Sequence, residues 1–363
     1  MKVIVVGAGV IGCAVAYELA RRGADVHVLD NRAPGRGATF ASAGILAPAV
    51  EGHNPDLLHL TSCSLAAYDD FITRVRRDSG VDVEYARTGT LQVAFTSEQA
   101  AVLADSAARL AASGIAHEML DAAGARALEP QVSSAVTSAL HVPTQGFVGA
   151  EQLVSALVQA AARRGATVVA SRVERIEDTP NGAAVVTSRE RLDADAVIVA
   201  TGSWSVDSPR SPEVGPVKPI RGQLLHLQVE EPIASSVLWG PDCYIVPWRN
   251  RTTLVGATVE DVGFDESATV EGVRSLLTAA VAVAPALDRA RFLEVRVGLR
   301  PKTEDELPAI GRSSTMHHVF YATGLYRNGV LLAPLTATML ADLVVEGREH
   351  PDLARVPPDR LGL

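Results

Sequence analysis

The sequence predicts an α/β protein in which a parallel sheet, assembled from separated pieces of the chain, is combined with an antiparallel sheet. The chain opens with "VIVVGAGVIG", residues 3–12, where an apolar run passes directly into a glycine pattern. A second apolar run meets glycine much later, in "ADAVIVATGSWS", residues 194–205. Between residues 219 and 259 the β-rich segments are short and bounded by turns, which is typical of antiparallel strands.

Length and composition favour a two-domain globular protein. A chain of 363 residues is long for one hydrophobic core, and 47% hydrophobic with 21% charged residues excludes a disordered chain. The net charge of -9 argues against nucleic acid or an anionic membrane surface as a partner. No apolar run reaches the roughly 18 residues of a membrane span, and the first apolar run is too short for a signal peptide. We therefore expect a cytoplasmic protein.

The cysteines give no indication of a metal centre or a disulfide framework. Cys13, Cys63 and Cys243 are scattered, odd in number and without the spacing of metal ligands. The histidines likewise form no metal-like pair, because the adjacent His317 and His318 would point to opposite faces of a strand. We expect buried or incidental thiols in a reducing compartment, and no metal site.

The first motif lies within a complete β–α–β unit. Residues 3–6 are apolar and β-branched, as in a strand buried on both faces of a parallel sheet. A helix follows in "CAVAYELARRG", residues 13–23, and should end at its glycine. The strand "ADVHVLD", residues 24–30, then ends on an acid.

This unit predicts a dinucleotide site. Gly7, Gly9 and Gly12 let the backbone approach a pyrophosphate, which the N-terminus of the helix would face. Asp30 can accept a hydrogen bond from a ribose 2′-OH and disfavours a 2′-phosphate, so NADP is not expected. NAD and FAD both stay open on this motif alone.

A distant part of the chain returns to the same sheet. A helix is predicted in "EQLVSALVQAAARRG", residues 151–165, followed by the strand "ATVVAS", residues 166–171. Residues 196–200 form another buried strand that stops at a glycine. Since the NAD domain of dehydrogenases is usually contiguous, a nucleotide domain built from separated pieces indicates a flavoprotein with an interleaved substrate domain.

The segments between these pieces predict a second sheet and two packing elements. "LLHLQV" (224–229), "DCYIVPW" (242–248) and "TTLVGATV" (252–259) have the pattern of antiparallel strands rather than further β–α–β units. Residues 97–128 and 267–284 are rich in alanine and leucine and are expected to be helices without chemistry.

The sequence resembles the amine oxidases of the D-amino acid oxidase family, and within it the glycine oxidases of the thiamine-pathway type. The segments that carry the resemblance cover nearly the whole chain in the order that the family shows. They are "VVGAGVIG", "GATFASAGILAP" (37–48), "TGTLQVA" (88–94), "LEPQVS" (128–133), "ATGSWS", "PIRGQLL" (219–225), "CYIVPW" (243–248), "TLVGATVEDVGFD" (253–265), "GLRPKTEDELPAIG" (298–311) and "GLYRNGVLLAP" (324–334).

The resemblance implies a discontinuous, Rossmann-like FAD-binding domain that carries the GxGxxG motif. An interleaved substrate-binding domain is built on an antiparallel sheet with helices. The expected FAD-binding pieces are residues 1–86, 145–217 and 300–363, and the expected substrate-binding pieces are residues 87–144 and 218–299.

The same resemblance implies the chemistry. Members of the family move hydride from the carbon next to nitrogen onto flavin N5; the imine hydrolyses, and oxygen reoxidises the flavin to give hydrogen peroxide. The implied cofactor is non-covalent FAD, which acts as the electron sink. The implied partners are an amino acid or N-substituted glycine as substrate and molecular oxygen; a homo-oligomer is left open.

Three residues are implied as catalytic. A substrate carboxylate is best held by a planar, bidentate cation, and Arg300 in "GLRP" resembles the family's carboxylate-binding arginine. Its alternative is a surface ion pair with the acids at 304–306. Tyr244 in "CYIVP" resembles a tyrosine that hydrogen-bonds the carboxylate, and Arg327 in "YRNG" resembles an arginine near the flavin and the substrate mouth.

The implied cofactor contacts fall in several glycine-rich or loop segments. The loop "RNGVLLAP" leads into a helix whose first N–H groups could stabilise negative charge on the reduced flavin's N1–C2=O locus. The implied cofactor-binding residues are Gly7, Gly9, Val10, Ile11, Gly12, Asp30, Asn31, Arg32, Ser42, Ala43, Gly44, Leu46, Val173, Ala200, Thr201, Gly202, Trp204, Arg300, Arg327, Asn328, Gly329, Val330 and Leu331.

Two positions depart from the glycine oxidase pattern. Leu325 stands where a histidine usually precedes "YRNG", and "EVRVGLRP", residues 294–301, lacks the usual tryptophan. Both changes are expected to alter the pocket wall. We therefore expect an N-substituted glycine as substrate, cleaved to glyoxylate and a free amine.

Two alternatives stay open. One is a D-amino acid oxidase or dehydrogenase that acts on larger side chains. The other is the flavin subunit of a multisubunit amine dehydrogenase, which would pass electrons to a partner instead of oxygen.

Overall fold

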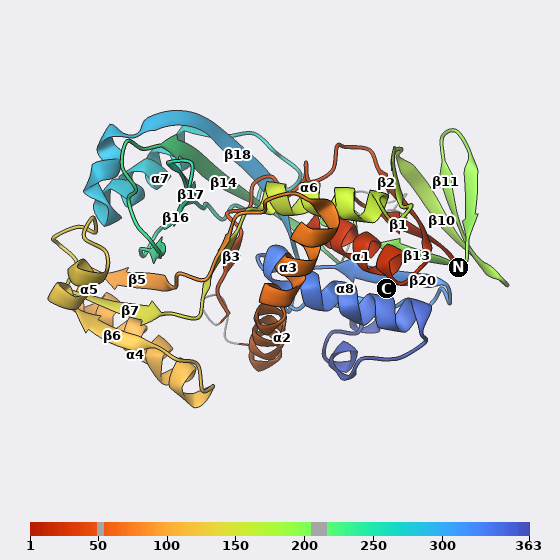
Figure 1. The fold of residues 1–363 in the computed structure, drawn as a ribbon, viewed down its shortest axis with the longest axis horizontal. Helices are drawn as coiled ribbons and strands as arrows, with labels where there is room; N and C mark the ends of the chain where they lie inside the picture. Colours follow the sequence, from red (N-terminus) through yellow and green to blue (C-terminus); the bar gives the residue numbers. More distant parts are fainter. Residues whose placement is uncertain (49–53, 205–215) are drawn as a thin grey trace.

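The computed structural model describes residues 1–48, 54–204 and 216–363, and its centre is a pair of large sheets (Figure 1). The six-stranded sheet lies towards the right of the view with both termini, and the eight-stranded sheet lies towards the left. Ser205 of the "ATGSWS" motif, and residues 205–215 of the expected FAD-binding piece 145–217, lie outside the described residues.

The six-stranded sheet is assembled from separated pieces of the chain, as predicted. Strand β1 pairs in parallel with two strands, so that Val5 lies opposite Ile198 on one side and Val28 on the other. Its residues Val3–Val6 are buried, which explains the unbroken apolar run. In spatial order the strands are β19 (Ala309–Arg312), β20 (Val319–Thr323), β13 (Ala196–Val199), β1 (Lys2–Val6), β2 (Asp25–Asp30) and β9 (Thr167–Ala170), and β19 alone of these is antiparallel to its neighbour.

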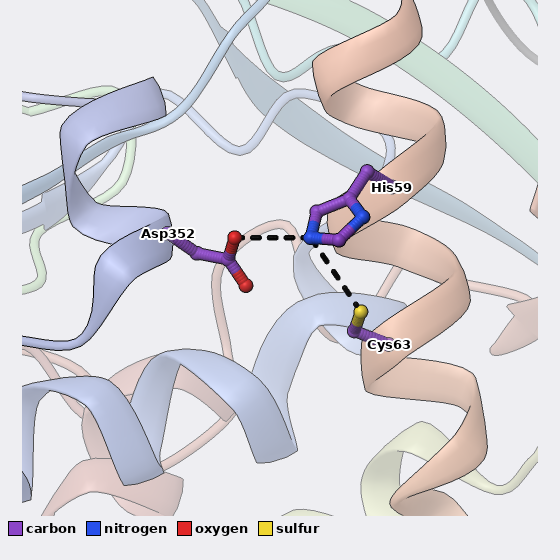
Figure 2. Close-up of side chains that lie close together, drawn as sticks. All are labelled: His59, Cys63 and Asp352. Atoms are coloured by element: carbon purple, nitrogen blue, oxygen red, sulfur yellow. Dashed lines mark hydrogen bonds and ion pairs between the residues drawn. The ribbon is translucent and has the colours of Figure 1, made fainter.

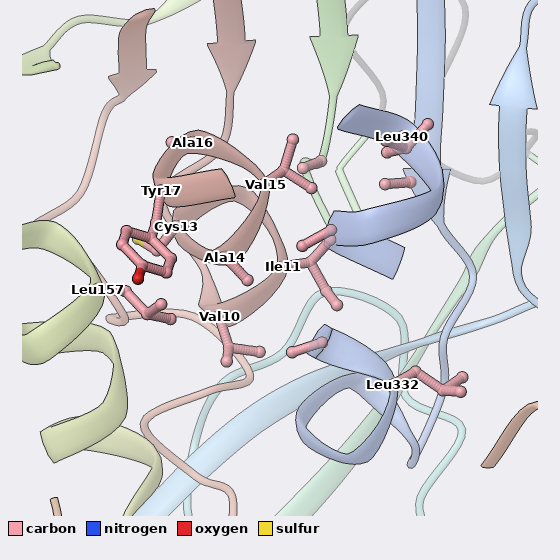
Figure 3. Close-up of a cluster of buried hydrophobic side chains, with 14 of the residues drawn as sticks. Val10, Ile11, Cys13, Ala14, Val15, Ala16, Tyr17, Leu157, Leu332 and Leu340 are labelled. Atoms are coloured by element: carbon pink, nitrogen blue, oxygen red, sulfur yellow. The ribbon is translucent and has the colours of Figure 1, made fainter. Parts of the chain in front are cut away.

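Helix α1 is buried on all sides within the layer that covers this sheet. Figure 3 shows its apolar side chains in one buried cluster with Leu157 of α6 and both Leu332 and Leu340 of α8. A helix that is buried all round needs apolar residues all round, which accounts for "VIGCAVAYELA". The helices of this part are α1 (Val10–Arg21), α2 (Pro55–Ala66), α3 (Tyr68–Ser79), α6 (Ala150–Ala162) and α8 (Gly329–Val345).

The eight-stranded sheet combines two pieces of the chain. Its neighbouring strands are antiparallel except at one junction, where β15 pairs in parallel with β5, in register Leu238 with Leu91. In spatial order the strands are β18 (Arg291–Lys302), β14 (Lys218–Gln228), β17 (Thr252–Gly256), β16 (Tyr244–Pro247), β15 (Val237–Trp239), β5 (Thr90–Ala94), β7 (Ser138–Val142) and β6 (Glu118–Asp121). The predicted antiparallel sheet is confirmed.

The prediction of helices over residues 97–128 is confirmed at both ends of this range, but a strand that was not predicted lies between them. Helix α4 (Ser97–Ala112) is followed by Gly114 at φ +68°, which turns the chain into β6. Asp121 then accepts a hydrogen bond from the N–H of Gly124 and caps the short helix α5 (Ala122–Leu128). The second packing element is α7 (Val270–Val283), which ends in η2 (Pro285–Arg289).

Two small sheets and two short helical turns complete the described chain. They are β10 (Val173–Thr179), β11 (Gly182–Thr187) and β12 (Arg191–Ala194); β3 (Ile45–Leu46), β8 (Gly146–Val148) and β4 (Tyr85–Ala86); and η3 (Pro351–Arg355) and η4 (Pro358–Leu361). No helix among the described residues is both long and apolar enough to cross a membrane. The domain boundaries given above stay predictions.

Candidate active site

A cavity of about 1000 Å³ lies where the two large sheets meet. Its lining takes in the carboxyl ends of three parallel strands, at Val6, Asp30 and Ala200, and five strands of the eight-stranded sheet. Ligands of open α/β sheets bind at such strand ends, so this cavity is the candidate site.

At the first turn of the glycine motif the backbone leaves no room for side chains. Gly7 has φ +108°, and a Cβ on it would lie 2.4 Å from the carbonyl oxygen of Ala200. The turn delivers the chain into the N-terminus of α1, where the hydroxyl of Thr39 accepts a hydrogen bond of 3.1 Å from the N–H of Val10. The remaining first-turn N–H groups have no partner within the helix, as an anion site requires.

The carboxylate of Asp30 is fixed at the end of β2 by two backbone groups. One oxygen accepts the N–H of Ala8 at 2.7 Å, and the other accepts the N–H of Arg32 at 2.8 Å. The carboxylate borders the cavity and keeps lone pairs for a ribose hydroxyl. This end of the cavity therefore fits the adenosine diphosphate half of FAD.

Gly12 and Leu46 do not belong to the cavity lining, contrary to the expectation from the sequence. A Cβ on Gly12 would lie 1.9 Å from the carbonyl oxygen of Gly7, so this glycine allows α1 to pack against the turn. Leu46 is fully buried in the hydrophobic core. All the other residues named from the sequence for the cofactor line the cavity.

The start of helix α8 faces the cavity and is supported from behind. Pro334 lacks an N–H, so the carbonyl of Val330, four residues earlier, loses its helical donor. The hydroxyl of Tyr68 donates to that carbonyl at 2.6 Å, and the hydroxyl of Ser64 donates to the carbonyl of Leu331 at 2.7 Å. These contacts fix a helix N-terminus, lined by Asn328–Leu331, at which negative charge is stabilised.

Arg300 lies on β18 with its guanidinium against the neighbouring strand. Its Nη1 donates to the carbonyl of Thr258 at 3.0 Å and to that of Arg221 at 3.4 Å. A Cβ on Gly222 of β14 would lie 2.3 Å from the guanidinium, so the absence of a side chain there makes room for it. Arg300 lines the cavity, and among the described residues no carboxylate lies within ion-pair distance of it.

The acids that follow Arg300 are engaged elsewhere. Asp305 accepts a 2.7 Å hydrogen bond from Arg360, and Glu306 pairs with Lys302 at 2.7 Å. Asp305 and Glu306 therefore do not form the surface ion pair that was considered as the alternative role of Arg300.

Tyr244, like Arg300, lies beside a glycine on the neighbouring strand. It lies on β16 opposite Gly256 of β17, and a Cβ on that glycine would lie 2.5 Å from the tyrosine oxygen. The ring packs beside Trp239, with centroids 5.4 Å apart, and both residues line the cavity. A glycine on the neighbouring strand thus makes room for each side chain proposed to recognise the substrate.

Arg327 lines the cavity next to a strained residue. Its guanidinium lies over the ring of Tyr326, 5.1 Å from the centroid, and Tyr326 adopts φ +46°, which is uncommon for a residue other than glycine. The Nζ of Lys302 lies 5.4 Å from the same ring. Lys302 pairs with Glu306 and lies outside the lining, so Arg327 is the one of these two cations that borders the cavity.

A loop over residues 257–268 contributes Ala257 and Val259 to the cavity lining and was not anticipated as a unit. Buried Arg221 donates to Asp265 of this loop at 2.6 Å. Arg32, whose guanidinium also lies over Trp204, forms a two-bonded pair with Glu266 at 2.8 and 2.9 Å. The loop is thereby tied to both sides of the cavity. Cavity-lining residues that sequence reasoning missed include Arg36, Thr39, Ala41, Gly222, Trp239, Asp242, Gly256, Ala257, Val259, Gly298 and Tyr326.

Only one of the two departures from the family pattern reaches the cavity. Leu325 lines it and is almost fully buried. Residues 294–297 of β18 lie outside the lining, because this part of the strand turns to surface pairs in which Arg296 contacts Glu151 and Glu294. The expectation that the missing tryptophan alters the pocket wall concerns a side chain that this chain does not carry, and it stays a prediction.

A family model described as FAD dependent oxidoreductase matches residues 2–343. The chain belongs to this family. Its cofactor is therefore FAD, in agreement with the glycine turn, Asp30 and the start of α8 described above.

Individual relatives confirm the resemblance to glycine oxidases. Glycine oxidase of Geobacillus kaustophilus (strain HTA426) is 32% identical over 359 residues, which cover 97% of this chain and 95% of that protein. The crystal structure of glycine oxidase from Geobacillus kaustophilus matches with a TM-score of 0.93 and covers 98% of both chains. Iminodiacetate oxidase from Chelativorans sp. BNC1 is 27% identical, with a TM-score of 0.87 over 98% of both chains.

Proposed function

We propose that this protein is an amine oxidase that acts on N-substituted glycines in preference to glycine itself. The observation that carries the proposal is Arg300, an arginine bound to main-chain carbonyls that lines the same cavity as the apolar side chains of Leu325, Trp239 and Val259. The similarity to a glycine oxidase and to an iminodiacetate oxidase supports the substrate class.

The glycine part of the substrate would be recognised through its carboxylate. Arg300 uses Nη1 for the backbone and keeps further N–H donors for a planar, two-bonded contact. Tyr244 lines the same cavity and can donate a hydroxyl to the carboxylate. Together they would fix the substrate and its Cα in one orientation.

The nitrogen substituent would lie against apolar surface. Leu325, Trp239 and Val259 all line the cavity. An apolar wall offers no hydrogen bond to a free amine, whereas it gains from contact with the carbon atoms of a substituent. We infer that a secondary amine makes more apolar contact with these residues than glycine does, and is therefore the better substrate.

FAD, when bound, supplies the acceptor for the two electrons that leave the substrate. The residues that would hold it are the glycine turn at Gly7 and Gly9, the carboxylate of Asp30, and the first N–H groups of α8. With water and oxygen as co-reactants the overall change balances as R–NH–CH2–COO⁻ + H2O + O2 → R–NH2 + OHC–COO⁻ + H2O2.

Oxygen uptake with a graded series of amines tests the proposal. Glycine, N-methylglycine, N-ethylglycine and iminodiacetate should all be oxidised, with kcat/KM higher for at least one N-substituted member than for glycine. Glyoxylate and hydrogen peroxide should appear in equal amounts. Faster turnover of glycine than of every N-substituted analogue would refute the preference, and turnover of D-amino acids above both would favour the D-amino acid oxidase alternative.

The electron acceptor needs a separate measurement. Peroxide formation by the purified chain in air, compared with dye reduction under nitrogen, distinguishes an oxidase from the flavin subunit of a dehydrogenase. An oxidase should give peroxide at the rate of substrate loss. Dye reduction without peroxide would support the dehydrogenase alternative.

A further inference from the structure

A second cluster of reactive side chains lies outside the cavity lining, where α2 meets the C-terminal turn η3 (Figure 2). His59 and Cys63 come from α2, and Asp352 comes from η3. The Nε2 of His59 lies 3.0 Å from the Oδ1 of Asp352 and 3.7 Å from the Sγ of Cys63. All three ligand atoms lie within 4.8 Å of one another.

We propose that His59, Cys63 and Asp352 form a binding site for a Zn²⁺-type transition-metal ion. In a tetrahedral zinc site the ligand bonds of about 2.0–2.3 Å place neighbouring ligand atoms about 3.3–3.6 Å apart. The separation of 3.0 Å between His59 and Asp352 lies just below this range, and the separation of 3.7 Å between His59 and Cys63 lies just above it. Small movements of side chains would suffice to admit the ion, which would replace the proton that His59 and Asp352 share.

The backbone presents the donors from two fixed elements. His59 and Cys63 are one helical turn apart and therefore share one face of α2. Asp352 is buried and lies in the first turn of η3, 293 residues from His59. Two of the three ligands thus need no long-range folding to meet, and the third is brought to them by the docking of the C-terminal segment.

The donor set selects the class of ion. A thiolate, an imidazole and a carboxylate suit zinc and its neighbours, whereas magnesium and calcium prefer oxygen alone. One thiolate and one carboxylate would neutralise the charge of a divalent ion. The expectation of no metal site did not consider a mixed His–Cys pair with a distant carboxylate.

The surrounding charged groups are compatible with such an ion. The Nε of Arg355 donates to the Oδ1 of Asp352 at 3.2 Å and so orients this carboxylate from outside the ligand set, while the Nη1 of Arg355 pairs with Asp56. The Nδ1 of His350 lies 3.8 Å from the Oδ2 of Asp352, but it accepts the backbone N–H of Asp352. This nitrogen is therefore committed to capping η3, and the fourth position is left to solvent.

Such an ion would attach the C-terminal segment to a helix that supports the candidate active site. Ser64 follows Cys63 directly and donates to the carbonyl of Leu331 at the start of α8. The proposal does not depend on the substrate of the enzyme, because none of the three ligands lines the cavity.

Cobalt(II) binding to the FAD-loaded, chelator-treated protein tests the proposal. Co²⁺ should bind with one ion per chain and give visible d–d bands of a four-coordinate thiolate site, at longer wavelengths than the absorption of oxidised flavin. Added Zn²⁺ should remove these bands. Absence of such bands from the wild-type protein would overturn the proposal.

Substitutions locate the ion. Cys63→Ser and His59→Ala should each abolish the bands and weaken Zn²⁺ binding by more than the roughly 10–100-fold that loss of an outer partner costs. His27→Ala is the matched control, because His27 also pairs with a carboxylate, Asp25 at 3.3 Å, on the surface of the same part of the molecule. This variant should bind Co²⁺ like the wild type, and bands that persist in Cys63→Ser would place the ion elsewhere.

A chemical measurement on the unmodified chain covers the case in which the variants do not fold. Cys63 is the partly exposed cysteine, while Cys13 and Cys243 are buried. Stoichiometric Zn²⁺ should slow alkylation of Cys63 by iodoacetamide at least tenfold, as read by peptide mass spectrometry. An unchanged alkylation rate at saturating Zn²⁺ would overturn the proposal.

Discussion

The two ends of the cavity are built by different means. On the side of the six-stranded sheet, the backbone forms the site through the turn at Gly7, the start of α1 and the start of α8. On the side of the eight-stranded sheet, the side chains of Arg300 and Tyr244 form it, each lying where a neighbouring strand carries glycine. The first kind of site is specified by consecutive residues, and the second by the register between strands.

This difference predicts which property is lost when a side chain is added at each end of the cavity. A side chain added at the backbone end collides with main chain, which cannot move without the strand. A side chain added at the other end collides with the tip of Arg300, which can swing away. Damage at the first end should therefore remove the cofactor and the fold, and damage at the second should remove only substrate affinity.

The largest effect is expected for Gly7→Ala. The new Cβ would lie 2.4 Å from the carbonyl oxygen of Ala200, and φ +108° is strained for alanine. The variant should be recovered without flavin or in insoluble form, as measured by flavin absorbance per chain after gel filtration.

Gly23→Ala is the control for backbone strain alone. Gly23 also has a positive φ, +85°, but no atom lies within 4 Å of its added Cβ. This variant should keep its flavin and lose about 1–2 kcal/mol of unfolding free energy. If Gly7→Ala kept its flavin as Gly23→Ala does, the close approach to Ala200 would not explain flavin loss, and the comparison between the two ends of the cavity would be refuted.

Arg300→Ala should have the next largest effect, on substrate alone. Loss of a charge-assisted contact with the carboxylate costs about 1.5–3 kcal/mol, or about 10–150-fold in kcat/KM. FAD content should stay at the wild-type level. Arg291→Ala, an exposed position on the same strand, is the control and should keep full activity; equal kcat/KM in the two variants would show that Arg300 does not bind the carboxylate.

A smaller effect of the same kind is expected for Gly222→Ala. Its Cβ would lie 2.3 Å from the guanidinium of Arg300 and displace it without removing it. We expect KM to rise about tenfold, the equivalent of about 1.4 kcal/mol, with flavin still bound. The double variant with Arg300→Ala should be no worse than Arg300→Ala alone, and additive losses would mean that Gly222 acts independently of the arginine.

The sequence predicts the two ends of the cavity unequally, because one is specified by consecutive residues and the other by the register between strands. The strand at residues 3–6, the helix after it and the acid at Asp30 are consecutive, so pattern and motif predict both the local fold and the cofactor. The later strands were assigned to the first sheet as part of a second helix–strand stretch that ends at a glycine, and β9 and β13 confirm that assignment. A motif does not say which of its residues face the ligand, and Gly12 and Leu46 were named for the cofactor although they lie outside the cavity lining.

At the other end the sequence identified Arg300 and Tyr244 only through a family resemblance. Gly222 and Gly256 carry no local signal, because their role depends on which residue of the next strand lies beside them. The pairing of β15 with β5 likewise joins residues about 150 positions apart, and no periodicity within either strand specifies it. Information of this kind resides in tertiary contacts.

The helices over the two sheets also differ in what attaches them, and this gives the smallest predicted effect. Asp78 at the end of α3 accepts 2.8 Å hydrogen bonds from Tyr17 of α1 and from Arg164 after α6. Burial acts to raise the pKa of Asp78, but the hydrogen bonds from Arg164, Arg77 and Tyr17 outweigh it and lower the pKa to about 2. Helix α7 is instead attached through uncharged groups, since Thr269 exchanges hydrogen bonds of 2.9 Å with Gln223.

Because its folded pKa is depressed, Asp78 contributes stability above about pH 4, and that contribution is lost as the pH falls towards about 2. Asp78→Asn should cost about 1–2 kcal/mol at neutral pH, and its Tm deficit should shrink over that acid range. Thr269→Ala removes a helix cap worth about 1 kcal/mol, and its Tm deficit should stay constant over the same range because no ionised group is lost with it. A deficit of Asp78→Asn that also stayed constant would mean that the carboxylate holds α1, α3 and α6 through shape rather than charge, and that the helix layers of the two sheets are attached alike.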